Sequence, residues 1–121
     1  MRRRAVMNMN FGLTRWLTEQ TRPSRWRQAS KDCKKQDGHC RVCRIKKNLE
    51  AHDVGPYHLY ERPYAISYDE WRNNMVTLCR IAGLGCHIQH GHCGDPNGLM
   101  YNYRIREIVF AVECRLDGCV S

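Results

Sequence analysis

The pattern of polar and apolar residues predicts two short strands near the middle of the chain. Residues 48–54 alternate in polarity and end at Gly55-Pro56, and residues 75–79 form a second run of mostly apolar character. A long tyrosine-rich connection over residues 57–73 separates them. We expect the two strands to pair in an antiparallel manner, which gives a small sheet.

Helical signals flank this predicted sheet on both sides. Pro23-Ser24 is typical of a helix start, with Ser24 as the N-cap of a helix over residues 25–35 that Asp37-Gly38 ends. After the second strand, a short helix is expected to carry residues 86–92.

The end of the chain predicts a closing helix over residues 99–116, although residues 108–112 could equally form a strand. The apolar residues expected on one face of this helix are Leu99, Tyr103, Ile108 and Val112. Taken together, the elements predict an α+β fold with a small central sheet and flanking helices.

Length and composition favour one domain with a thin core. A chain of 121 residues buries too little surface for a large core, so we expect an additional cross-link, such as a bound metal ion, to stabilise the fold. No stretch approaches the roughly 18 apolar residues of a membrane span, and no apolar run follows the basic start as in a secretory signal. We divide the chain into a basic arm (residues 1–22) and a folded domain (residues 23–121).

The net charge of +8 is concentrated in the first part of the chain. Residues 1–47 hold 14 Lys and Arg against 3 Asp and Glu, whereas residues 48–121 hold 6 against 9. A basic segment of this kind favours a polyanion, and DNA is the expected partner; the alternative is a solvated tail that binds nothing. The candidate nucleic-acid-binding residues are Arg25, Arg27, Lys34, Lys35 and Arg41.

Cysteine spacing points to a structural zinc ion. Cys40 and Cys43 form a CxxC knuckle that can place two sulfurs on one tetrahedral ion, and Cys79 and Cys86 are the candidates for the other two ligands. Six residues between Cys79 and Cys86 are a wide gap for a knuckle, but two of them are glycines, which allow the insert to loop out.

The other four cysteines, Cys33, Cys93, Cys114 and Cys119, are expected to be small buried side chains. A less favoured alternative is a second zinc site formed by Cys114, Cys119 and Cys93 with His90 or Cys33. Because no secretory signal is seen, a cytoplasmic location with reduced thiols is expected, in a bacterial cell or a phage-infected one.

The order of elements and histidines resembles the HNH endonuclease family, whose core is a ββα-metal finger. The resemblance covers about residues 24–115, and it is closest to a small phage and bacterial subgroup. Its motifs are Asp37-Gly38-His39-Cys40-Arg41-Val42-Cys43, Leu49-Glu50-Ala51-His52-Asp53-Val54-Gly55-Pro56, Asn74-Met75-Val76-Thr77-Leu78-Cys79 and Cys86-His87-Ile88-Gln89-His90-Gly91-His92.

The resemblance implies a zinc-stabilised finger that uses one divalent metal ion to hydrolyse DNA phosphodiester bonds. His52 and His87 are the implied metal ligands, with His92 as the third ligand and His90 as its competitor. Asn74 is the implied residue that holds the loop and orients the base. Imidazole ligands suit Zn²⁺, Ni²⁺ or Mn²⁺ better than Mg²⁺, which remains in the set of candidate metals.

Asp53 departs from the family pattern, because a histidine general base usually follows the metal-binding histidine. An aspartate is ionised at neutral pH but is a weak base. Asp53 could still act as the base, or it could ligate the metal while His58 or His52 takes that role, or the site could bind without efficient cleavage.

We therefore expect the protein to be a metal-dependent HNH endonuclease that acts on DNA. Cleavage of one strand, or nicking, is one expected activity, and a larger phage or bacterial DNA-processing machinery is one expected partner. A non-catalytic zinc-finger module that binds nucleic acid is the alternative. A disulfide-rich secreted basic protein is the third hypothesis.

Overall fold

A computed structural model describes residues 22–81 and 85–118 as a mixed α+β fold around a two-stranded sheet. Strand β1 (Leu49–Asp53) pairs antiparallel with β2 (Met75–Cys79), with His52 opposite Val76 and Asp53 opposite Met75. This confirms the two predicted strands and their orientation. The predicted arm, except Arg22, lies outside the described residues.

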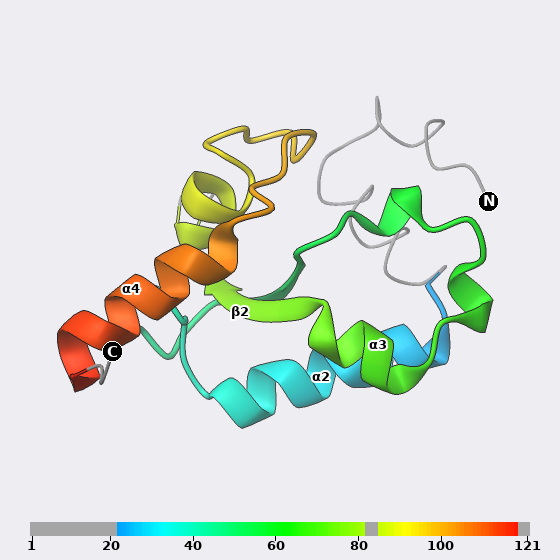
Figure 1. The fold of residues 1–121 in the computed structure, drawn as a ribbon, viewed down its shortest axis with the longest axis horizontal. Helices are drawn as coiled ribbons and strands as arrows, with labels where there is room; N and C mark the ends of the chain where they lie inside the picture. Colours follow the sequence, from blue (N-terminus) through cyan, green and yellow to red (C-terminus); the bar gives the residue numbers. More distant parts are fainter. Residues whose placement is uncertain (1–21, 82–84, 119–121) are drawn as a thin grey trace.

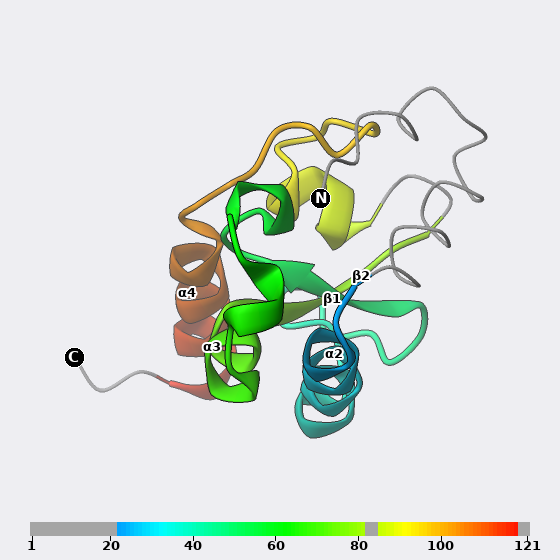
Figure 2. The ribbon, with the colours of Figure 1, turned by 90° about the vertical axis from the view of Figure 1, so that its right-hand side faces the viewer.

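Helices cover both faces of the sheet, and β2 is therefore buried along its whole length. Helix α2 (Ser24–Asp37) packs on the face that presents Met75, and α4 (Ile105–Asp117) packs on the face that presents Val76 and Leu78. Figure 1 shows these two helices on opposite sides of β2. In Figure 2, α2 lies below the strands, whereas the turn η4 (His87–Gly91) lies above them.

Two separate apolar clusters fill the space between these layers. The first joins β2 to α4 through Ile105 and Val109, and it includes three of the four predicted zinc ligands. The second joins α2 to the connection after β1 through Trp26, Tyr57 and Trp71. Each cluster is small, as the chain length predicts.

The connection between the strands contains a helix that the sequence analysis did not predict. Helix α3 (Tyr68–Asn73) begins at Ser67, whose side chain accepts a hydrogen bond from the Glu70 backbone, while the Glu70 carboxylate accepts one from the Ser67 backbone. Ser67 and Glu70 have the spacing of a capping box, so the signal was present in the sequence. Two single 3-10 turns, η2 (Tyr57–Leu59) and η3 (Pro63–Ala65), precede it.

The predicted boundaries of the flanking helices were wrong in two respects. The first helix follows Pro23 as its N-cap residue, and no side-chain hydrogen bond from Ser24 caps it. The last helix begins at Ile105 rather than near residue 99, so Leu99 and Tyr103 precede it and are exposed. Ile105 and Val109 form its buried face instead, because they meet β2 one helical turn apart.

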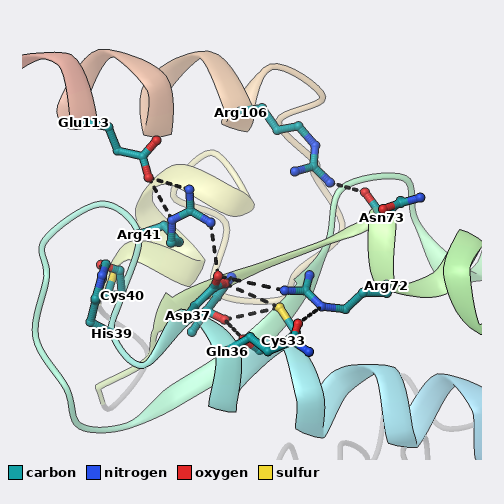
Figure 3. A network of polar contacts seen from close by, with 11 residues as sticks. Cys33, Gln36, Asp37, His39, Cys40, Arg41, Arg72, Asn73, Arg106 and Glu113 are labelled. Atoms are coloured by element: carbon teal, nitrogen blue, oxygen red, sulfur yellow. Dashed lines mark hydrogen bonds and ion pairs between the residues drawn. The ribbon is translucent and has the colours of Figure 1, made fainter. Parts of the chain in front are cut away.

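A network of charged side chains ties the end of α2 to α4 and α3 (Figure 3). Arg41 ion-pairs with Glu113 of α4 and, at 3.1 Å, with Asp37 of α2. Arg72 of α3 lies 4.0 Å from the same Asp37 carboxylate. Across the described ranges, no helix has the length and apolar character needed to cross a membrane.

Candidate metal centres

The four cysteines predicted to bind zinc come together in the structure. The sulfurs of Cys40, Cys43, Cys79 and Cys86 lie within 4.8 Å of one another, and Cys43 Sγ is 3.5 Å from Cys79 Sγ. A tetrahedral zinc ion with sulfur ligands at about 2.3 Å separates its sulfurs by roughly 3.8 Å. This four-cysteine group is therefore compatible with a structural metal ion such as zinc.

Local backbone geometry prepares these sulfurs as ligands. The Val42 and Cys43 amides donate to Cys40 Sγ at 3.4 Å, and the Cys86 amide donates to Cys79 Sγ at 3.4 Å. Burial opposes ionisation of Cys40, but these amide hydrogen bonds outweigh it and lower the pKa of the thiol. Burial, together with the neighbouring Cys40, raises the pKa of Cys86.

The remaining cysteines do not form a second zinc site in the described part of the chain. Cys33 is buried against Thr77 as expected, Cys93 is exposed against expectation, and neither belongs to a group of candidate metal ligands there. Cys114 is disulfide-bonded, which contradicts the expectation of reduced thiols and removes its sulfur as a ligand. Cys119 lies outside the described residues.

Three histidines form a second group of candidate metal ligands. Ring nitrogens of His52 on β1 and of His87 and His92 on or beside η4 lie within 4.8 Å of one another. His90 is not a member of this group, so the structure favours His92 over His90 as the third ligand. No carboxylate belongs to the group, and Asp53 is therefore not among these ligands.

Hydrogen bonds fix which nitrogens of two histidines are available. His87 Nδ1 donates to the Glu50 carboxylate at 2.8 Å, and His92 Nδ1 donates to the Met100 carbonyl at 2.9 Å. Both partners can only accept, so each Nε2 carries a lone pair when its ring is neutral. Such carboxylate and carbonyl partners are typical of metal-binding histidines, because they orient the ring.

The two free nitrogens point at each other across a short distance. His92 Nε2 lies 3.1 Å from His87 Nε2, so their lone pairs repel unless a proton or a cation lies between them. Tetrahedral zinc with two imidazole ligands at about 2.0–2.1 Å places the nitrogens roughly 3.3 Å apart. The spacing therefore fits a shared metal ion.

Burial argues against a proton as the shared cation. His52 is 1% exposed, and both of its ring nitrogens are buried without a hydrogen-bond partner among the described residues. Burial, together with the neighbouring His87 and His92, lowers the pKa of His52 to about 2. Burial and the neighbouring His87 also lower the pKa of His92 to about 4. Neutral imidazoles in this arrangement can serve as metal ligands.

The backbone around the histidines is shaped for this close approach. A Cβ atom on Gly91 would lie 3.0 Å from the His52 ring and 3.1 Å from Leu78, so a larger residue here would require these side chains to shift. The glycine before His92 in the sequence motif thus has a packing reason. Tyr101 stacks on His52 with a ring-centroid distance of 5.7 Å and contacts His92 edge-on.

Asp53 lies apart from the histidine ligands and is held by Trp26 and Arg22. Trp26 Nε1 donates to its two oxygens at 3.1 and 3.2 Å, and Arg22 ion-pairs with it at 3.2 Å. Arg22 itself lies over the Trp26 and Tyr57 rings. The predicted arm ends at Arg22, and the structure instead places this residue against the folded domain.

Asn74 holds the turn that follows Asp53. Its side-chain amide donates to the Gly55 carbonyl at 2.9 Å and accepts from the Gly55 amide at 2.8 Å. Its backbone carbonyl accepts from the Val54 amide at 2.7 Å. These three bonds connect the start of β2 to the end of β1, as the resemblance implies for this asparagine.

A pocket of about 350 Å³ joins the histidines to Asp53 along β1. The sequence analysis missed several of the residues that shape it, because neither their type nor their spacing marks a site. These residues are Arg22, Trp26, Glu50, Arg80 and Tyr101. His58, the other candidate base, is exposed, and its ring lies 6.1 Å from the Tyr101 ring.

The predicted nucleic-acid-binding residues differ in their availability. Lys34 lines the pocket, whereas Arg25, Arg27 and Lys35 are exposed on α2 outside its lining. Arg41 is engaged by Glu113 and Asp37, which also raise its pKa although burial opposes them.

Searches against protein-family models, curated proteins and solved structures find no match to this chain.

Proposed function

We propose that this chain is a metal-dependent endonuclease of the HNH type that hydrolyses DNA phosphodiester bonds. The observation that carries the proposal is the buried group of His52, His87 and His92, with two free Nε2 atoms facing each other at 3.1 Å beside a pocket. The same order of strand, asparagine, strand and helical turn defines the ββα-metal finger implied by the resemblance.

A divalent ion held by these three imidazoles would supply Lewis-acid stabilisation of negative charge that develops on a phosphate group. Glu50 and the Met100 carbonyl hold the His87 and His92 rings in the orientation that this requires. Tyr101 covers His52 and excludes water from that side. The four-cysteine group, loaded with zinc, would anchor the start of η4 to the end of β2.

Asp53 is the proposed general base that accepts a proton from the attacking water. Its carboxylate lines the same pocket as the histidines without belonging to their group. Arg22 and Trp26 hold its orientation, and Asn74 holds the turn that follows it. A correctly placed base contributes about 10²–10⁴-fold to a rate.

The second candidate is a zinc-binding module that binds nucleic acid without cutting it. The observation that favours it is the contact of Asp53 with Arg22 and Trp26, because a carboxylate tied to these donors is a weaker proton acceptor. In that case the metal centres serve the fold and the basic residues serve binding.

Nicking of supercoiled plasmid separates the two candidates. Wild-type protein should convert the plasmid to the open circular form when Mn²⁺, Ni²⁺, Zn²⁺ or Mg²⁺ is added in turn, and His52→Ala should abolish the reaction. His90→Ala is the matched control, since His90 is close in sequence but outside the ligand group. Plasmid binding without nicking under any of these metals would instead support the binding module.

A further inference from the structure

One face of α2 forms a wall of the pocket at a spacing of four residues. Trp26, Ser30 and Lys34 lie on this face, and Arg22, four residues before Trp26 and just before the helix begins, continues the stripe. Strand β1 also contributes, since all five of its residues line the pocket. The pocket lining therefore includes both the histidine group and the residues from Arg22 to Lys34 along this face of α2.

Charges along the stripe are not balanced. The two acidic residues of the pocket are already paired, Asp53 with Arg22 at 3.2 Å and Glu50 with His87 at 2.8 Å and Arg80 at 3.6 Å. Lys34 lines the pocket with no ion-pair partner among the described residues. The ammonium group of Lys34 therefore gives this end of the pocket an excess positive charge.

We propose that the α2 stripe is the wall that binds the substrate strand, with Lys34 contacting a backbone phosphate near the reacting one. This inference rests on the proposed nuclease function and names how that site holds DNA. Two helical turns separate Trp26 from Lys34, which is about 12 Å. One strand of B-form DNA carries three or four phosphates over roughly that length.

Two neighbouring lysines of α2, Lys34 and Lys35, differ in their position relative to the stripe. Lys34 and Lys35 are adjacent on α2 and carry the same charge, but only Lys34 lines the pocket. A general electrostatic attraction to DNA would treat the two alike. A phosphate bound in the pocket would contact Lys34 and not Lys35, so the pair provides a matched control.

The test is the salt dependence of binding to a short fluorescent DNA duplex, measured by anisotropy without added divalent metal. Lys34→Gln should weaken binding several-fold and reduce the slope of log affinity against log salt by about 0.9, the value for one lost phosphate contact. Lys35→Gln should reduce the slope by clearly less than Lys34→Gln does, because Lys35 lies outside the pocket lining. Lys34→Arg should retain the wild-type slope, and thermal melting checks that each variant is folded.

The outcomes separate this inference from the nuclease proposal. Equal slopes for Lys34→Gln and Lys35→Gln, in a protein that still nicks plasmid, would overturn the assignment of the stripe and leave the nuclease proposal standing. Wild-type protein that neither binds the duplex nor nicks plasmid would overturn both.

Discussion

Asp53 is the residue at which this chain departs most from the pattern it resembles, and the structure gives the departure a physical context. A histidine at this position would lose the ion pair with Arg22, whereas aspartate uses Arg22 and Trp26 to fix its orientation. The sequence shows the substitution, but it does not show these two contacts, because they come from a segment about 30 residues earlier. The role of Asp53 is therefore best decided by substitution.

We expect Asp53→Asn to lower the nicking rate by about 10²-fold or more, because the amide cannot accept the proton. Asn retains the size of the side chain and an oxygen for Trp26, so metal content and melting temperature should stay close to wild type. Asp53→His should cut faster than Asp53→Asn near neutral pH, since an unperturbed imidazole has a pKa of about 6.5. Nicking by Asp53→Asn at the wild-type rate would exclude Asp53 as the base.

At the scale of elements, a metal ion bound by the four-cysteine group would add cross-links that so small an apolar core lacks. It joins the knuckle after α2 to the end of β2 and the start of η4, three segments that are far apart in sequence. Stabilities of whole domains are about 5–15 kcal/mol, and structural zinc contributes on that scale. Loss of a bound ion should therefore lower the free energy of unfolding of the whole domain.

Cys43→Ser should release zinc and lower the melting temperature by more than about 10 °C, which corresponds to a few kcal/mol in a domain of this size. Cys93→Ser is the matched control, because Cys93 is also exposed and free but lies outside the ligand group. Zinc content by atomic absorption and thermal melting by circular dichroism measure both effects. Equal melting temperatures for the two variants would contradict a structural role for this group.

Most elements with local signals could be predicted from the sequence, although α3 was missed despite its capping box, and limits that depend on packing could not. The strands follow from alternation of polarity, and they lie where the pattern puts them. The start of α4 is set by Ile105 meeting the sheet, so the apolar residues before it misled the prediction. In the candidate site, spacing identified the cysteines and histidines that come together, whereas Glu50 and Tyr101 could be assigned only by tertiary contact.

At the scale of the whole molecule, the arm contributes positive charge, whereas the folded domain contains the candidate site. Residues 1–21 carry four arginines and one glutamate, whereas Arg22 belongs to the pocket wall. A deletion that separates DNA attraction from site geometry must therefore end at residue 21. The arm and Arg22 can then be tested independently.

Removal of residues 1–21 should weaken DNA binding and flatten its salt dependence, because fewer phosphates are neutralised. Nicking at saturating protein should persist, since the deletion removes none of the residues, from Arg22 onward, that line the pocket. Arg22→Gln in the full chain should instead lower the nicking rate at saturation, because Asp53 loses a contact that holds its orientation. An unchanged salt slope after the deletion would show that the arm does not contact DNA.

The most direct test of the central claim is a metal titration in which bound metal and nicking rate are measured in the same samples. Protein that carries one equivalent of zinc in the four-cysteine group is titrated with Mn²⁺ or Ni²⁺, beside His92→Ala. Metal binding and nicking should rise together, saturate at one added equivalent, and both be lost in His92→Ala. Full occupancy without nicking, or equal nicking by His92→Ala, would contradict the claim that this histidine group is the catalytic metal centre.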